Sequence, residues 1–166
     1  MDSRAILAEI PRLRRYARAL LGDRAAADDL VQDTLERAWR RLAQWRAGSD
    51  LRAWLFSIMH NLRVDQLRRP TLPTHALDDD CDEAPTRPTQ SDQLELADLE
   101  AALRQLPDEQ RAVLLLVALE EMSYAEVAAA LEIPLGTVMS RLSRGRERLR
   151  LIMEGRPSAA NLRVVR

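Results

Sequence analysis

Cysteine, histidine and glycine are scarce in this sequence, and their scarcity removes whole classes of chemistry. The 166 residues include one cysteine, Cys81, and two histidines. A single thiol excludes an intrachain disulfide framework and is too few for a thiolate zinc site. The sequence also has no glycine-rich phosphate loop and no Ser/His/Asp set. We therefore expect a protein that is not an enzyme and that takes no cofactor, no metal and no small-molecule substrate.

Long apolar runs are missing as well. No stretch approaches the ~20 apolar residues that a helix needs to cross a bilayer. The N-terminus carries Asp2, Arg4 and Glu9 in an amphipathic pattern, which is unlike the apolar core of a signal peptide. A single cysteine fits a reducing compartment. The expected location is the cytoplasm, without membrane insertion.

The low glycine content also bears on the fold. Five glycines leave few positions for turns with positive φ, while 46% of the residues are hydrophobic, chiefly alanine and leucine. These side chains lose little conformational freedom on a helix. Runs of β-branched residues, which would indicate strands, are absent. The predicted fold class is therefore all-α.

Lysine is absent, because all 25 basic residues are arginine, and the formal net charge is only -1. The charge is unevenly distributed: residues 1–69 carry 14 arginines and nine acids, whereas residues 78–100 carry nine acids and one arginine. A GC-rich genome accounts for arginine in place of lysine, but only arginine gives bidentate contacts to phosphate and guanine. The asymmetry suggests basic working surfaces joined by an acidic connector, so the near-neutral total does not exclude a nucleic-acid partner.

Apolar residues recur at spacings of three and four in the N-terminal part of the chain, which is the period of a helix. A loop over residues 44–50 precedes the last of these segments, with Ser49 or Asp50 as its N-cap. Aromatic residues at helical spacing are usually core, so Trp39, Trp54 and Phe56 are expected to be buried. Three helices are predicted here, over residues 6–21, 25–42 and 51–68.

Two small helical domains are predicted, covering residues 1–69 and 93–155, with a frayed tail over 156–166. Residues 70–92 hold four prolines, few large apolar residues and a run of aspartates, a composition typical of a flexible linker. Fully extended, such a linker reaches roughly 70 Å, about two turns of B-DNA. Whether the domains pack together is left open by the sequence. One hypothesis is that the linker folds back on the arginine-rich faces through Asp78, Asp79, Asp80, Asp82 and Glu83.

Residues 122–150 have the pattern of a helix-turn-helix motif. Ser123 and Glu126 have the spacing of a capping box at the start of the first helix. The turn contains Glu132 where many such motifs have glycine, which makes its geometry less certain than that of the helices. An arginine-rich solvated helix end is the alternative interpretation, but it does not explain the capping box or the tight turn. One face of the second helix carries the residues expected to read DNA: Thr137, Ser140, Arg141, Arg144 and Arg148.

The segment 134–146, with the pattern Pro-x-Gly-Thr-Val-x-Ser-Arg-Leu-x-Arg-Gly-Arg, resembles the fourth conserved region of extracytoplasmic-function (ECF) sigma factors. Residues 28–34 and 54–69 resemble the second region of the same family. The two resemblances follow the family order and together cover most of residues 10–150. A generic helix-turn-helix regulator could share the C-terminal motif, but the N-terminal resemblance is specific to the sigma class.

This resemblance implies a fold of two sigma domains, core RNA polymerase and promoter DNA as partners, and control by an anti-sigma factor. Thr137, Ser140, Arg141, Arg144 and Arg148 then correspond to the reader of the -35 element. Two positions depart from the family pattern: relatives often carry a basic residue at the position of Met139, and some carry an aromatic residue at the position of Ser143. The residues that correspond to contacts with the -10 element are Trp45, His60, Asn61, Arg63, Arg68 and Arg69. Those that correspond to the polymerase-docking helix are Asp28, Asp29, Gln32, Asp33 and Arg37.

Two rival functions remain besides an enzyme. The first is a helix-turn-helix regulator like the output domain of a response regulator, which would bind DNA without polymerase. It leaves the N-terminal resemblance unexplained, and residues 1–69 are too short and too helical for a receiver domain. The second is an adaptor that binds an anti-sigma factor or another helical protein without reading DNA. Replacing Arg141 and Arg144 together distinguishes it from a DNA reader.

Overall fold

The computed structural model describes residues 3–69 and 90–162 of the chain. These two stretches contain seven α-helices and one short 3-10 helix, and no strand. The acidic segment that includes Asp78–Asp80 and Cys81 lies outside the described residues, so the fold-back hypothesis is not tested. Within the described ranges, the all-α fold class is confirmed. The helices are α1 (Ser3–Leu21), α2 (Arg24–Arg40), η1 (Leu42–Gln44), α3 (Leu51–Arg68), α4 (Gln90–Arg104), α5 (Asp108–Ala118), α6 (Tyr124–Leu131) and α7 (Leu135–Leu162).

The N-terminal half is a three-helix unit in which α2 packs against both α1 and α3. Asp23 caps α2 by accepting a hydrogen bond from the Ala25 amide, and Asp50 caps α3 by accepting from the amides of Arg52 and Ala53. The buried aromatic rings of Tyr16 and Phe56 join α1 to α3 in an edge-to-face contact, with centroids 5.1 Å apart.

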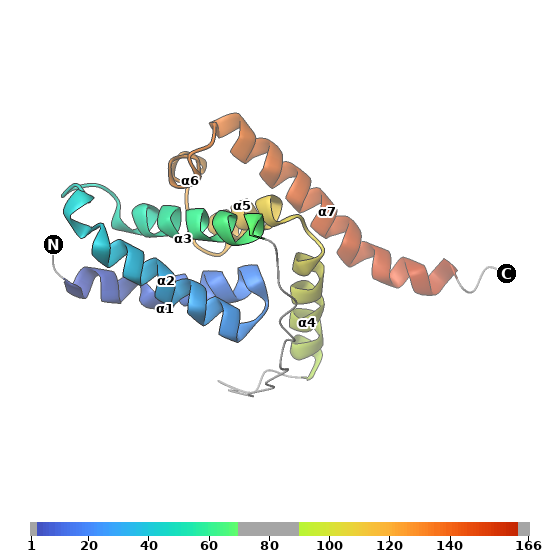
Figure 1. Cartoon of the computed structure of the whole chain (residues 1–166). Coiled ribbons are helices and arrows are strands. Elements are labelled where there is room, and N and C mark those ends of the chain that lie inside the picture. The colour runs from blue at the N-terminus through green and yellow to red at the C-terminus, as the bar shows by residue number, and fades with distance from the viewer. Residues whose placement is uncertain (1–2, 70–89, 163–166) are drawn as a thin grey trace.

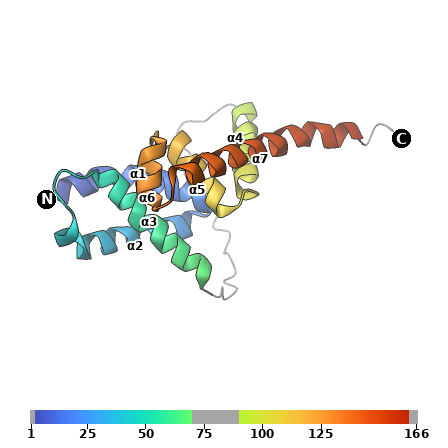
Figure 2. The same cartoon turned by 90° about the horizontal axis from the view of Figure 1, so that it is seen from above.

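The C-terminal half is built around α7, which packs against α4, α5 and α6. In both views of the molecule, the end of α7 projects away from the other helices (Figures 1 and 2). Its N-terminal part completes the core through Val138 and Leu142, which are 0% and 2% exposed. Gly145 lies against α5, where an added Cβ would stand 3.4 Å from the Gln110 side chain.

The two halves pack together. The helices α1 and α5 are in contact, as are α3 and α6, and one continuous cluster of buried residues runs from Leu13 through Phe56 to Val113 and Val138. In Figure 2, α6 and the start of α7 lie over α3. The question that the sequence left open, whether the halves associate, is answered by this shared core.

Arginines at the junction reinforce the apolar contact. Arg15 of α1 forms two hydrogen bonds with the carboxylate of Glu120, at 3.1 and 3.2 Å, and the Glu120 side chain is fully buried. Arg52 of α3 donates to the Glu120 carbonyl at 3.1 Å. Arg111 of α5 donates to the Leu20 carbonyl at 2.7 Å. Several of these bonds end on backbone oxygens rather than on side chains.

Three expectations need correction. Trp39 is not core, because its side chain is 54% exposed and the adjacent Ala38 takes the buried position. The chain after Gly155 is not a frayed tail within the described residues, since α7 continues to Leu162. The helix α4 begins at Gln90, inside the segment expected to be linker.

Candidate nucleic-acid interface

The helix-turn-helix geometry arises from local contacts at both ends of α6. Ser123 accepts a hydrogen bond from the Glu126 amide at 3.1 Å, and the Glu126 carboxylate accepts one from the Ser123 amide at 2.9 Å, so the capping box is confirmed. Glu132 ends the helix in the left-handed conformation, with φ 54° and ψ 46°. That backbone turn, followed by Pro134 at the entry of α7, sets the angle between the two helices.

The predicted -35 face divides into an exposed part and a shielded part. Ser140, Arg144 and Arg148 are exposed, and neither arginine has an ion-pair partner among the residues that the structure describes. Thr137 is half-buried, and Arg141, 24% exposed, pairs with Glu109 of α5 at 3.6 Å. The exposed residues form a cationic, hydrogen-bonding surface on the outer side of α7, as contact with a DNA major groove requires.

The predicted -10 residues are also divided. Asn61, Arg68 and Arg69 are exposed along the C-terminal half of α3 and just beyond its end. Arg63 is held at the junction of the two halves, 3.1 Å from the carboxylate of Asp108, and its side chain is only 21% exposed. Trp45, at the end of η1, is half-buried with its indole nitrogen buried and without a hydrogen-bond partner in the described part of the chain.

His60 lies half-buried at the same junction. Burial lowers the pKa of its imidazole below the ordinary value of 6.5; Arg141 lowers it further, while Asp108, Glu109 and Glu132 oppose the shift. A predicted -10 residue and a predicted -35 residue, His60 and Arg141, therefore influence each other electrostatically across the junction. The packing of the halves brings together two sites that the sequence places more than seventy positions apart.

The outer face of α2 is polar, as expected for a docking helix. Asp29, Gln32 and Asp33 are exposed, whereas Asp28 and Arg37 are half-buried beside neighbouring helices. Asp28 lies 3.9 Å from Arg18 of α1, and Arg37 lies 3.9 Å from Asp65 of α3. Both contacts are partly exposed pairs of the kind that contributes little to stability, so they restrain the side chains more than they stabilise the fold.

Family models match both halves of the chain. Residues 6–60 match the family described as the Sigma2 domain of PhyR, and residues 96–149 match sigma-70, region 4. The ECF RNA polymerase sigma factor EcfG of Rhodopseudomonas palustris (strain TIE-1) is 39% identical over 149 residues, covering 89% of this chain and 82% of the relative. The chain belongs to the ECF class of RNA polymerase sigma factors. The helices α1–α3 thus contain the sigma region 2 match, and α4–α7 contain the region 4 match.

Two solved structures are similar to this chain over most of its length, and one of them is of a sigma factor. The sigma factor RpoE of Bartonella quintana, in complex with the anti-sigma factor NepR, matches with a TM-score of 0.73 and 32% identity, covering 91% of this chain and 95% of that one. CnrH, in complex with the cytosolic domain of CnrY, matches with a TM-score of 0.68 and 28% identity, covering 92% and 86%. The rival hypothesis of a helix-turn-helix regulator like the output domain of a response regulator does not explain the match to sigma region 2, and it is rejected.

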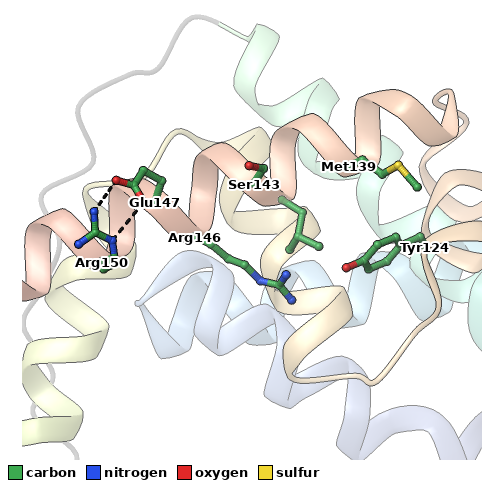
Figure 3. A pocket seen from close by; sticks show the side chains of 7 residues that line it. Tyr124, Met139, Ser143, Arg146, Glu147 and Arg150 are labelled. Atoms are coloured by element: carbon green, nitrogen blue, oxygen red, sulfur yellow. Dashed lines mark hydrogen bonds and ion pairs between the residues drawn. The ribbon is translucent and has the colours of Figure 1, made fainter.

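Sequence reasoning notes Met139 and Ser143 only as departures from the family pattern and does not assign the flank of α7 on which they lie. Met139, Ser143 and Arg146 are exposed on the flank of α7 away from Arg141 and line a groove with Tyr124 of α6 (Figure 3). Their spacing of four and three is the same signal that identified the predicted face. The helix period places these residues on one side of α7, but their side chains do not share one chemistry, so the period alone does not indicate a site there.

No group of three or more metal-ligating side chains occurs within residues 3–69 and 90–162 of the sigma factor. In the same ranges, no helix has the length and hydropathy of a membrane span.

Proposed function

We propose that the chain is a non-catalytic specificity subunit that binds core RNA polymerase in the cytoplasm and directs it to the promoters of a stress or envelope-type regulon. Region 2 reads the -10 element and region 4 reads the -35 element. The observation that carries this proposal is the presence of both sigma regions in one chain, together with a capped helix-turn-helix whose outer face exposes Ser140, Arg144 and Arg148.

Polymerase docking is assigned to α2. The exposed polar side chains of Asp29, Gln32 and Asp33 lie on its outer face, with Asp28 and Arg37 at the edges. A polar helix face over a firm apolar one suits a helical partner, because charge complementarity there gives specificity and speeds association.

Promoter contacts are assigned to both halves. The -35 duplex is contacted by residues of α7: Thr137, Ser140, Arg144 and Arg148. The -10 strand is contacted by residues at the end of α3, Asn61, Arg68 and Arg69, with Trp45 and His60 nearby. In the arrangement of the structure, with the two halves packed together (the closed arrangement), Arg63 pairs with Asp108 of α5 and Arg141 pairs with Glu109 of α5. We propose that promoter phosphates replace Asp108 and Glu109 as partners of these two arginines when the halves separate on DNA.

Control is assigned to an anti-sigma factor. A similar sigma factor, RpoE, has been solved with the anti-sigma factor NepR, and the similar protein CnrH has been solved with the cytosolic domain of CnrY. An inhibitor that binds the closed arrangement would keep Arg63 and Arg141 engaged with α5 and so withhold them from promoter DNA.

The deciding experiment is run-off transcription of fragmented genomic DNA by sigma-free core polymerase, with and without the protein, followed by mapping of transcript 5′ ends. Discrete starts that depend on the protein and share -10 and -35 sequences are the expected result. Arg144→Ala should reduce these transcripts at least tenfold, whereas Arg12→Ala, an exposed arginine on α1, should not. A folded protein that yields no new start would contradict the proposal.

A second candidate function is an adaptor that binds an anti-sigma factor without reading DNA. One observation favours it: residues 6–60 match the family described as the Sigma2 domain of PhyR, and PhyR of Bartonella quintana is described as an anti-anti-sigma factor in complex with the anti-sigma factor NepR. Replacing Arg141 and Arg144 together with alanine separates the two functions. Loss of promoter binding with intact binding of the protein partner would exclude the adaptor.

A further inference from the structure

An open groove of about 530 Å³ runs along the flank of α7, between this helix and the start of α6. Its wall includes two large side chains that remain exposed, Tyr124 at 36% and Met139 at 47% (Figure 3). Leu142 forms the floor and is almost fully buried. The groove therefore offers an apolar surface to solvent beside the polar stripe of Ser140 and Arg144.

Helix-turn-helix geometry indicates where this groove would lie relative to bound DNA. In such motifs the N-terminal residues of the second helix contact base edges, and the first helix crosses the DNA backbone. Met139 is the fifth residue of α7 and is adjacent to Ser140. Tyr124 is the first residue of α6. Met139 thus lies at the depth of the bases, and Tyr124 lies nearer the phosphates.

The chemistry of Met139 limits what it can recognise. A thioether is at most a weak acceptor and has no donor, so its useful contact is apolar. Among the groups that base pairs present in the major groove, the apolar one is the C5-methyl group of thymine. The groove beside Met139 gives this methyl group a surface to bury, continuous with the face assigned to the -35 element.

The charged residues around the groove are compatible with a DNA strand. Arg146 points toward Tyr124 (Figure 3) and has no ion pair or hydrogen bond with another described residue. Glu147 would repel phosphate, but Arg150 binds its two oxygens at 2.6 and 3.1 Å. Arg150 also donates to Glu154 at 2.7 Å. Arg150 therefore offsets part of the negative charge of Glu147 and Glu154, while Arg146 is available to bind a phosphate.

We propose that Met139 is a specificity-determining residue that reads one thymine methyl group in the -35 element, with Tyr124 and Arg146 binding the adjacent backbone. The proposal rests on the promoter-directing function above and names a chemical feature of the promoter. It extends the reading surface of α7 from the Ser140 and Arg144 stripe to the adjoining flank that carries Met139.

The test uses holoenzyme assembled from core polymerase and the full chain, on a promoter mapped by run-off transcription. Each thymine of the -35 element, on either strand, is replaced singly by deoxyuridine, which removes only the methyl group. For the wild-type protein, one replacement should weaken promoter binding about fourfold, the effect of burying one methyl group. Met139→Ala should bind the thymine and deoxyuridine promoters equally.

Leu151→Ala is the matched control, because Leu151 is 54% exposed on the same helix but three turns further on. It should keep the preference for thymine. The proposal is overturned if the wild type ignores every replacement, if Met139→Ala keeps the preference, or if Leu151→Ala loses it. The first of these results requires no variant and therefore does not depend on folding. Absence of transcription would instead refute the promoter-directing function itself.

Discussion

The guanidinium of Arg111 binds the ends of two helices at once. It donates to the carbonyl of Leu20 at 2.7 Å and also, at 2.7 to 3.0 Å, to the carbonyls of Leu103, Arg104 and Leu106. These oxygens lie at or just beyond the ends of α1 and α4, where carbonyls lack the helical partner four residues on; the Leu103 carbonyl also accepts from the Leu106 amide at 3.1 Å. The side chain is only 11% exposed, and its burial lowers the pKa of the guanidinium. Arginine suits this position because its planar fork carries five donors.

Arg111→Ala should lower the free energy of unfolding by about 3 kcal/mol, because it removes four hydrogen bonds to partly buried or exposed carbonyls and the packing of a largely buried side chain. Arg111→Lys should recover only part of this loss, since a single ammonium cannot reach all of the acceptors. Urea denaturation measures both effects. Arg148→Ala, at an exposed arginine of α7, should change stability by less than about 0.5 kcal/mol. Similar losses for Arg111→Ala and Arg148→Ala would contradict this account.

At the scale of the element, Glu132 has the backbone conformation that favours glycine, φ 54° and ψ 46°. A side chain in the left-handed region costs about 1–2 kcal/mol. Glu132→Gly should therefore stabilise the protein by up to about 1 kcal/mol, after allowing for the greater freedom of glycine in the unfolded chain. Glu154→Gly is the matched control, because it lies within α7 and should destabilise by about 1 kcal/mol. Thermal unfolding should shift in opposite directions for the two variants.

The sequence predicts elements well where the signal is local. The bounds of α3 and the Ser123–Glu126 capping box follow from caps and helix period alone. The helix period predicts the wrong environment for Trp39, because it neighbours the true buried position, Ala38, whose small side chain allows close helix packing. The sequence does not predict the extension of α7 beyond Gly155, because that segment has no apolar period.

The candidate site is less predictable, because part of it depends on how the halves pack. The helix period predicts that Arg144 and Arg148 are exposed, and the structure agrees. It gives no information on the partners of Arg63 and Arg141, which are acids of α5 more than thirty positions away in sequence. Long-range ion pairs of this kind follow from tertiary packing and leave no pattern in either segment.

At the scale of the whole molecule, the buried carboxylate of Glu120 has its ion-pair partner, Arg15, in the other half of the chain. The two hydrogen bonds from Arg15 raise the pKa of that guanidinium. Arg15→Ala leaves an unpaired buried charge and should weaken the association of the halves by roughly 1–3 kcal/mol, seen as a larger radius of gyration in small-angle X-ray scattering. The Arg15→Ala, Glu120→Gln double variant should be more compact than Arg15→Ala. If the double variant is equally expanded, the charge of Glu120 is not the cause.

His60 should make the association of the halves sensitive to pH. Burial lowers its pKa below 6.5, although Asp108, Glu109 and Glu132 act against Arg141 around it. The unfolded chain then binds this proton more readily than the folded protein, so stability falls as the pH drops through about 6.5. Urea midpoints at pH 7.5 and pH 5.5 should differ more for the wild type than for His60→Gln. An equal difference would assign the pH dependence to the acids.

The junction between the halves has a consequence for how the chain tolerates mutation. Arg52 and Arg111 donate across it to the backbone oxygens of Glu120 and Leu20, and Arg104 donates to that of Gly22 at 3.4 Å. A backbone oxygen is present whatever side chain the residue carries. A substitution that keeps the backbone path, such as Leu20→Ile, therefore leaves its bond in place, whereas substitution of the donating arginine removes the bond. Two acceptors are constrained for other reasons: a Cβ at Gly22 would stand 2.6 Å from Arg104 Nε, and the Glu120 carboxylate is bonded to Arg15. Arg111 should therefore be retained in evolution with little covariation between it and the side chain at position 20.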